Sequence, residues 1–192
     1  MTNIIIGASS FLGSNLSARL KNYNHKIYSL SYRPKAELEF FKNLEKLLIK
    51  NTIQNIYICG GSQSGSDSSD ELVDLFKSNI EMPGMICTLV KQNSPHTAII
   101  SFGSSWQFNA TLQSSPFNLY AATKSAAEKI FEHFVIDGIK ICTLRLYDTY
   151  GRNDLRPKIV NLIASAIKSN KKLQMSGGEQ FINLVHIEDV ID

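Results

Sequence analysis

The chain has 192 residues, a length that suits one domain, or one domain with part of another. Hydrophobic residues make up 43% of it and charged residues 19%, which is enough apolar material to bury a core and excludes a disordered or low-complexity chain. Twenty Lys and Arg against 17 Asp and Glu give a formal net charge of +3. So small and dispersed a basic excess argues against dedicated nucleic-acid binding.

Strand and helix patterns alternate along the chain. β-branched and apolar runs predict strands at residues 3–6, 26–31, 55–59, 97–102, 140–147 and 180–186. Helical spacing of apolar residues predicts helices at 12–20, 44–50, 72–90, 120–135 and 159–169, while 36–41 fits either a short strand or a first helical turn. The alternation is typical of βαβ units, so we expect an α/β fold with a Rossmann-type, doubly wound parallel sheet and helices on both faces.

Three cysteines lie in apolar runs without a Cys or His partner at metal-ligand spacing, so we expect buried free thiols and no metal site: Cys59, Cys87 and Cys142. No stretch approaches the ~20 apolar residues that span a bilayer. Since the chain opens directly on a β-branched run rather than a secretory leader, we expect a cytoplasmic protein without a membrane span. The polar stretch 62–70 lies between a strand and a helix, which suits a loop that covers a site.

The first predicted strand ends in a glycine-bounded turn from Gly7 to Gly13. Such a turn brings the backbone and the positive end of the next helix close to a pyrophosphate. Ser10 stands where a middle glycine is frequent; its hydroxyl can donate to a phosphate, while its Cβ can push a cofactor outward. The turn predicts a dinucleotide site formed by Gly7, Ser9, Ser10, Phe11, Leu12 and Gly13.

The end of the second predicted strand bears on the choice of cofactor. An acidic residue there would accept hydrogen bonds from the ribose 2′-hydroxyl of NAD, but the segment from Ser31 to Lys35 has none. Arg33 offers a guanidinium that matches a 2′-phosphate. The sequence favours NADP(H), with NAD(H) as the alternative if Arg33 and Lys35 are ordinary solvated charges.

A Tyr-x-x-x-Lys motif opens a predicted helix, with Tyr120 and Lys124 one turn apart on the same face. A lysine ammonium so close favours the phenolate and is expected to lower the tyrosine pKa towards the working range. The strand before it ends in hydroxyl groups at Ser104 and Ser105, either of which can hydrogen-bond a carbonyl oxygen. The order of glycine turn, serine and Tyr-x-x-x-Lys predicts a catalytic set of Ser104, Tyr120 and Lys124.

With these motifs in register, the chain resembles the extended short-chain dehydrogenase/reductase family of nucleotide-sugar epimerases, dehydratases and reductases. The matching segments are residues 7–13, 57–61, 79, 104, 120–124, 144–151 and 178–190. Within the family, 105–107, 118–124 and 148–151 are similar to the CDP-abequose and CDP-paratose synthase branch of 4-ketoreductases.

The resemblance implies a role for each matching residue. Tyr120 would be the acid/base, tuned by Lys124, and Ser104 would orient the keto oxygen, while Asn79 would brace the active-site helix or relay protons. Further cofactor contacts are implied at Ser31, Gly60, Gly61, Asn79, Tyr120, Lys124 and Tyr147, with Lys124 holding the nicotinamide ribose. Substrate contacts are implied at Ser105, Asp148, Arg156 and Lys158. The segment 180–183 lacks the arginine that often binds a substrate diphosphate, which leaves Arg152, Arg156 or Lys158 as substitutes.

The resemblance also implies an organisation and an activity. Residues 1–150 would form the NAD(P)-binding domain, and 151–192 the start of a substrate-binding region that is shorter than in the family. The expected activity is reduction of the 4-keto group of a nucleotide-linked 6-deoxy sugar for polysaccharide biosynthesis, by a homodimer. The alternatives are an epimerase or dehydratase with bound NAD, or a weakly catalytic protein that senses NADP(H).

Overall fold

A computed structural model describes residues 1–63, 69–109 and 111–192. The chain forms two compact units, Met1–Arg145 and Leu146–Asp192, and each is considered by itself. The expected domain boundary after residue 150 and the role given to 151–192 stay predictions, because compactness does not identify what a unit binds. Most of the polar stretch 62–70 lies outside the described residues.

The first unit alternates strands and helices, as expected. Its elements are β1 (Thr2–Ile6), α1 (Phe11–Asn22), β2 (Lys26–Leu30), α2 (Glu37–Lys50), β3 (Asn55–Ile58), α3 (Ser69–Phe76), α4 (Met82–Asn93), β4 (Ala98–Ser104), α5 (Leu119–Ile136) and β5 (Ile141–Leu146), whose last residue opens the second unit. Three short helical segments join them: the 3₁₀ turns η1 (Pro34–Ala36) and η3 (Ser105–Gln107), and the π-helical η2 (Lys77–Glu81).

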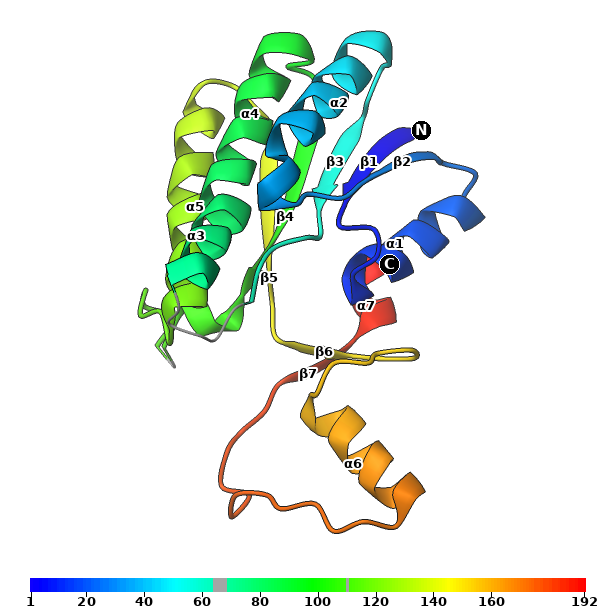
Figure 1. Cartoon of the computed structure of the whole chain (residues 1–192), viewed down its shortest axis with the longest axis vertical. Coiled ribbons are helices and arrows are strands. Elements are labelled where there is room, and N and C mark those ends of the chain that lie inside the picture. Colours follow the sequence, from blue (N-terminus) through cyan, green and yellow to red (C-terminus); the bar gives the residue numbers. More distant parts are fainter. Residues whose placement is uncertain (64–68, 110) are drawn as a thin grey trace. The chain divides into compact units, whose positions relative to one another are not determined.

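The five strands form one sheet in the order β2-β1-β3-β4-β5, and the pairs β2–β1, β1–β3 and β3–β4 are parallel. Figure 1 shows α2, α4 and α5 over one face of this sheet and α1 on the other. The chain leaves β1 first towards β2 and then returns to β3 on its other side. Since parallel crossovers are right-handed, this reversal sends the connecting helices to opposite faces and creates a ligand-binding crevice at the carboxyl ends of β1 and β3.

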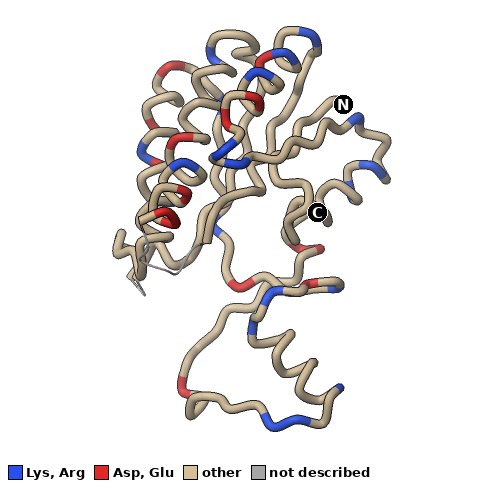
Figure 2. The backbone as a smooth tube through the Cα atoms, viewed as in Figure 1, with Lys and Arg blue, Asp and Glu red and all other residues tan. Residues whose placement is uncertain are grey.

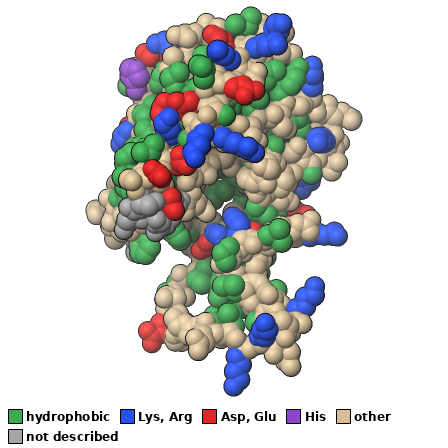
Figure 3. All heavy atoms as spheres, in the orientation of Figure 1, with side chains coloured by type: hydrophobic (Ala, Val, Ile, Leu, Met, Phe, Trp, Pro, Cys, Tyr) green, Lys and Arg blue, Asp and Glu red, His purple; other side chains and the backbone are tan. Residues whose placement is uncertain are grey.

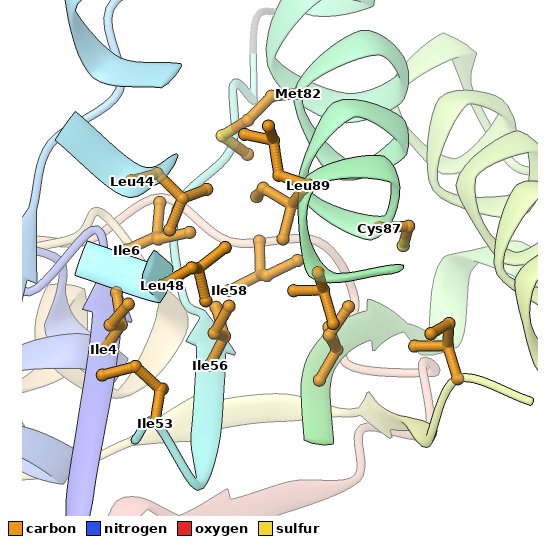
Figure 4. Close-up of a cluster of buried hydrophobic side chains, with 14 of the residues drawn as sticks. Ile4, Ile6, Leu44, Leu48, Ile53, Ile56, Ile58, Met82, Cys87 and Leu89 are labelled. Atoms are coloured by element: carbon orange, nitrogen blue, oxygen red, sulfur yellow. The ribbon is translucent and has the colours of Figure 1, made fainter. Parts of the chain in front are cut away.

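The core lies between the sheet and the layer of α2, α4 and α5. Every residue from Ile4 to Ile6 is fully buried, as expected for a central strand covered on both faces. Figure 4 shows side chains of β1 and β3 meeting those of α2 and α4, among them Ile4, Ile6, Leu44, Leu48, Ile56, Ile58 and Met82. Burying each of these side chains contributes about 1.5–3 kcal/mol, so the strand ends that carry the site are held by the best-packed part of the molecule.

Several elements differ from their predictions. The ambiguous segment 36–41 is helical, since Pro34 begins a 3₁₀ turn that runs into α2. The helix predicted over 72–90 is interrupted by the π turn η2. The expectation of buried thiols holds for Cys87, but Cys59 is only partly buried and Cys142, on the edge strand β5, is exposed.

The second unit contains β6 (Asp148–Tyr150), α6 (Ile159–Ser169), β7 (Leu184–His186) and α7 (Ile187–Ile191). β6 and β7 pair in parallel, with Thr149 opposite Val185. The strand predicted over 180–186 is therefore real only in its last three residues, which are those with a partner. In neither unit does the described chain include a helix long and apolar enough to cross a membrane.

Charges of both signs are interspersed along α2 and α5 (Figure 2). The face of the first unit seen in Figure 3 likewise mixes Lys and Arg with Asp and Glu instead of gathering one sign. The few cations that line a cavity are therefore more informative than the net charge.

Candidate functional site

A cavity of about 460 Å³ opens at the carboxyl ends of β1, β2 and β3. It is lined by residues that follow these strands, namely Gly7, Ser9, Ser10, Ser31, Tyr32, Arg33, Gly60, Gly61 and Ser62, and by Asp74, Ser78 and Met82 from the α3–α4 segment. The structure thus brings together half of the residues that the sequence analysis assigned to a cofactor, those of the glycine turn and of the ends of β2 and β3. Phe11, Leu12 and Gly13 lie instead in the first turn of α1 and are not among the lining residues.

Position 7 requires glycine, because the structure leaves no room there for a side chain. Gly7 has φ of +80°, and a Cβ on it would meet the Gly60 backbone at 2.6 Å. A Cβ on Gly13 would meet the Gly7 carbonyl oxygen at 2.2 Å, so the first turn of α1 packs directly on the glycine turn. These close approaches form a cradle of exposed backbone at a helix N-terminus, which fits the pyrophosphate of a dinucleotide.

Ser10 is the N-cap of α1. Its Oγ accepts a hydrogen bond from the Gly13 amide at 3.0 Å and donates one to the Cys59 carbonyl at 3.2 Å. The single hydroxyl hydrogen is therefore used within the protein in this structure, and both alternatives for Ser10, donation to a phosphate or displacement of a cofactor by its Cβ, stay predictions. In place of a middle glycine, Ser10 stabilises the helix start and ties it to the end of β3.

Arg33 is the cation that lines the cavity beside the end of β2, and its side chain is exposed. Lys35 is not among the lining residues. Tyr32 packs edge-on against Phe40, with ring centroids 5.1 Å apart, and burial raises the pKa of Tyr32 to about 12. Asp74 lines the cavity too, so one cationic and one anionic side chain face a ligand there.

Ser104 ends β4, and Tyr120 and Lys124 lie in the first two turns of α5, which is joined to β4 by the bond from Lys124 Nζ to the Phe102 carbonyl. Asn118 caps α5 by accepting from the Ala121 amide at 2.9 Å, and this fixes the first turn that carries Tyr120. The Tyr120 ring packs edge-on against Trp106, which follows Ser104 by two residues. Lys124 lies one turn further along, with Nζ 5.9 Å from the centre of the Tyr120 ring.

The protonation behaviour of this pair differs from the expectation. Burial raises the pKa of the Tyr120 phenol, and a hydrogen bond with the Gln63 side chain offsets this only in part. Burial also lowers the pKa of Lys124 to about 8. Lys124 Nζ donates to the Phe102 carbonyl at 3.2 Å, and no hydrogen bond joins it to Tyr120 within the described part of the chain. The predicted lowering of the tyrosine pKa is therefore wrong for this state, because desolvation acts on both groups and the ammonium is engaged elsewhere.

Asn79, in the π turn, is almost fully buried and links two parts of the site. Its Oδ1 accepts from the Ser62 amide, and its Nδ2 donates to the Ser62 carbonyl and to Thr123 Oγ1 on α5, all at 3.0 Å. A Cβ on Gly61 would approach Asn79 Oδ1 at 2.8 Å. Asn79 thus links the loop after β3 to α5, which is the geometry that a brace requires, and its role in the reaction stays a prediction.

Sequence reasoning missed a buried network beneath Ser104. Gln107 is fully buried and joins the Ser104 amide to Glu128 on α5, and Glu128 forms a bidentate ion pair with Arg145 on β5. One signal was available: Ser104-x-x-Gln107 has the spacing of a capping box, and the structure contains that box in full.

The candidate substrate residues of the second unit are largely paired with one another. Lys158 Nζ lies 2.5 Å from Asp148 Oδ1, and Arg156 binds Asp154 and the Thr149 carbonyl. Tyr147 is exposed. Their expected roles towards cofactor and substrate, like that of the partly buried Ser105, stay predictions. Within the described ranges, no three His, Cys, Asp or Glu residues are grouped so as to hold a metal ion.

Comparisons with known proteins agree with this geometry. The curated CDP-abequose synthase of Yersinia pseudotuberculosis is 26% identical over 206 residues, which cover 100% of this chain and 71% of that protein. UDP-glucose 4-epimerase of Thermotoga maritima, solved with UDP-glucose, matches with a TM-score of 0.84 at 17% identity, over 100% of this chain and 71% of that one. The structure of dTDP-glucose 4,6-dehydratase of Bacillus anthracis in complex with NAD matches with a TM-score of 0.81 at 16% identity, over 100% of this chain and 69% of that one.

At such identities the solved structures speak for the fold alone, and they confirm the Rossmann-type sheet. A family model described as the NAD dependent epimerase/dehydratase family matches residues 3–192. The chain therefore belongs to the NAD-dependent epimerase/dehydratase family and is an enzyme that uses a nicotinamide dinucleotide as cofactor.

Proposed function

We propose that the protein reduces the 4-keto group of a CDP-linked 6-deoxy sugar with NADPH. The observation that carries this proposal is the packing of Tyr120 against Trp106 and the bond from Lys124 to the Phe102 carbonyl, which bring the start of α5 to the end of β4, where Ser104 lies. The similarity to a CDP-abequose synthase supports the choice of substrate class. The cofactor would supply the hydride.

Arg33 supports the choice of NADPH. Its exposed side chain lines the cavity after β2, where a dinucleotide in this fold places its adenosine ribose. A guanidinium there pairs with a 2′-phosphate through two parallel hydrogen bonds. Replacing Arg33 by Ala is expected to raise the KM for NADPH and leave that for NADH nearly unchanged.

The raised pKa of Tyr120 suits the reductive direction. A phenol that stays protonated at neutral pH holds the proton that the keto oxygen must gain when hydride reaches the carbon. Ser104 Oγ accepts from the Trp106 amide at 3.2 Å, and its hydroxyl hydrogen has no acceptor in the described parts of the chain. It can therefore donate to the same oxygen and orient it. Lys124 adds positive charge beside the phenolate that remains, which is then reprotonated from water.

The test is oxidation of NADPH with a panel of CDP- and dTDP-linked 4-keto-6-deoxy sugars, with product stereochemistry read by NMR. Replacing Tyr120 by Phe should lower kcat by roughly 10²–10⁴-fold, because the proton donor is lost, while NADPH still binds. Tyr23→Phe is the matched control, since Tyr23 is exposed at the end of α1. Absence of turnover across the panel refutes the proposed function, and an unchanged Tyr120→Phe rate refutes the role of Tyr120.

A second candidate function is epimerisation with retained NAD, and Asp74 is the observation that favours it. Its carboxylate lines the same cavity as Arg33, and a carboxylate is the usual acceptor for the 2′-hydroxyl of NAD. The cofactor released by denaturing freshly purified protein separates the two candidates. Release of NAD favours the epimerase. Purified protein that releases no cofactor and oxidises added NADPH favours the reductase.

We also propose, from the resemblance, that the protein is a cytoplasmic homodimer. Light scattering after size-exclusion chromatography tests the dimer, and cell fractionation tests the location.

A further inference from the structure

The side chain of Gln107 occupies an unusual position for a polar group. It is completely buried, although it lies in a 3₁₀ turn whose neighbour Trp106 is exposed. A buried amide that lacked partners would cost more than an apolar residue of the same size, so its partners indicate why it is there.

Each end of the Gln107 amide meets a different element. Its Oε1 accepts from the Ser104 amide at 2.7 Å, at the last residue of β4. Its Nε2 donates to Glu128 Oε1 at 3.0 Å and approaches Ser125 Oγ at 3.4 Å, and both of these residues belong to α5. The two ends cannot be exchanged, because the Ser104 amide requires an acceptor and the Glu128 carboxylate requires a donor.

The network is anchored on its far side. Glu128 receives two bonds from Arg145 on β5, at 3.1 Å and 2.7 Å, and the Arg145 guanidinium lies 4.3 Å from the centre of the Phe108 ring. Gly103 leaves room for it: a Cβ there would approach Gln107 Oε1 at 2.6 Å and Glu128 Oε1 at 3.0 Å. The network therefore joins β4, β5, η3 and α5 at one point beneath Ser104.

We propose that Gln107 is a positioning residue, which holds Ser104 at a fixed place relative to Tyr120 by linking the end of β4 to α5 through Glu128. Ser104 and Tyr120 belong to different elements, so the separation of their hydroxyls depends on how those elements are joined. A fully satisfied buried network permits one arrangement and resists others. This inference rests on the role given to Ser104 in the proposed function.

The first test needs no substrate. Amide hydrogen exchange at Ser104, followed by NMR in the full chain, should speed up by roughly tenfold or more in Gln107→Leu, because the acceptor of that amide is lost. Gln92→Leu is the control, since Gln92 is exposed on α4. Exchange at Ser104 within about twofold of wild type would overturn the proposal.

The second test uses turnover and asks whether Gln107 acts through Ser104. Gln107→Leu should lower kcat by roughly 10–100-fold and leave the KM for NADPH nearly unchanged, because Gln107 does not line the cofactor cavity. In a Ser104→Ala background the same change should cost less than about twofold, since the group it positions is already absent. An equal loss in both backgrounds would reduce Gln107 to a structural residue.

A charge exchange covers the case in which Gln107→Leu fails to fold. Gln107→Glu sets two carboxylates against each other and should impair turnover, and adding Glu128→Gln restores a donor–acceptor pair and should recover most of it. Failure of the double variant to exceed Gln107→Glu contradicts the proposed link. A wild-type protein inactive on every 4-keto sugar would refute the proposed function, whereas amide hydrogen exchange at Ser104, which needs no substrate, still decides the inference.

Discussion

Two restrictions on a side chain coincide at Gly7. Its φ of +80° is unfavourable for any residue with a Cβ, and the Gly60 backbone lies 2.6 Å from where that Cβ would be. Gly138, with φ of +89° and open space around it, carries the first restriction only. We predict that Gly138→Ala lowers the free energy of unfolding by about 1–2 kcal/mol, whereas Gly7→Ala costs a further ~1–3 kcal/mol for overpacking and abolishes cofactor binding.

Urea unfolding and titration with NADPH measure both effects of the glycine variants. Equal unfolding free energies for Gly7→Ala and Gly138→Ala would mean that the turn relaxes away from Gly60. The cradle read from the close approach of the two backbones would then be incorrect.

Lys124 gives a prediction about alkaline pH. Burial lowers its pKa to about 8, whereas a lysine in an unfolded chain titrates near 10.4. Between these values the unfolded state binds more protons than the folded state, so the free energy of unfolding rises with pH through that window. This contribution is complete above about pH 10.4 and is lost as the pH falls through about 8.

The Lys124→Met variant isolates that contribution. Its free energy of unfolding should rise less between pH 8 and pH 10 than that of the wild type, as measured by urea titration at each pH. Lys91→Met, which removes an exposed lysine of α4 paired with Asp137, is the control. A wild-type slope in Lys124→Met would place the titrating group elsewhere.

At the scale of elements, the π turn between α3 and α4 positions Asn79. π turns of this kind frequently occur at functional sites. Asn79→Ala would leave the Ser62 amide and carbonyl without their partner and open a gap beside Thr123, so we predict a loss of about 2–4 kcal/mol in unfolding free energy. Cofactor affinity should fall as well, because Gly61 and Ser62 line the cavity.

Asn93→Ala is a matched control for the Asn79 brace. Asn93 ends α4, and its side chain bonds only to the Leu89 carbonyl of the same helix among its described contacts, so its loss should cost under about 1 kcal/mol and leave NADPH binding unchanged. Similar effects on cofactor affinity in the two variants would show that Asn79 has no special link to the site.

The same elements explain what the sequence could and could not predict. Apolar spacing was sufficient for strands such as β1 and helices such as α5, because burial against one core sets both patterns. The π turn leaves no mark in that spacing, since contacts of Asn79 with residues distant in the chain accompany it. The length of β7 likewise depends on pairing with β6, more than 30 residues earlier.

The candidate site divides in the same way. The glycine turn, Arg33, Ser104, Tyr120 and Lys124 were identified because their chemistry is local to short motifs. The pKa directions of Tyr120 and Lys124 could not be predicted in this way, because they depend on burial and on partners such as Phe102 that only the fold supplies. The capping-box spacing could have identified the bond from Gln107 to Ser104, but the bond from Gln107 to Glu128 is a tertiary contact that no local spacing predicts.

At the scale of the whole molecule, each unit carries its own acid-sensitive carboxylate. Burial alone would raise the pKa of Glu128, but hydrogen bonds from Arg145 and Gln107 outweigh it, and the pKa is lowered. In the second unit, burial alone would likewise raise the pKa of Asp154, but hydrogen bonds from Arg156 outweigh it, and the pKa is lowered. Both groups therefore stabilise the fold above their unfolded pKa values near 4, and this stabilisation is lost as the pH falls through the lower folded values.

The two losses should be separable, because Trp106 is the chain's single tryptophan and lies in the first unit. Glu128→Gln should weaken the acid dependence of unfolding followed by Trp106 fluorescence. Asp154→Asn should act mainly on the transition followed by far-UV circular dichroism, with a cost of about 1–3 kcal/mol at pH 7 from weakened bonds to Arg156. Glu39→Gln, at an exposed position of α2, is the control. If Asp154→Asn moves both signals equally, the units unfold together, and the two ion pairs protect one cooperative structure against acid.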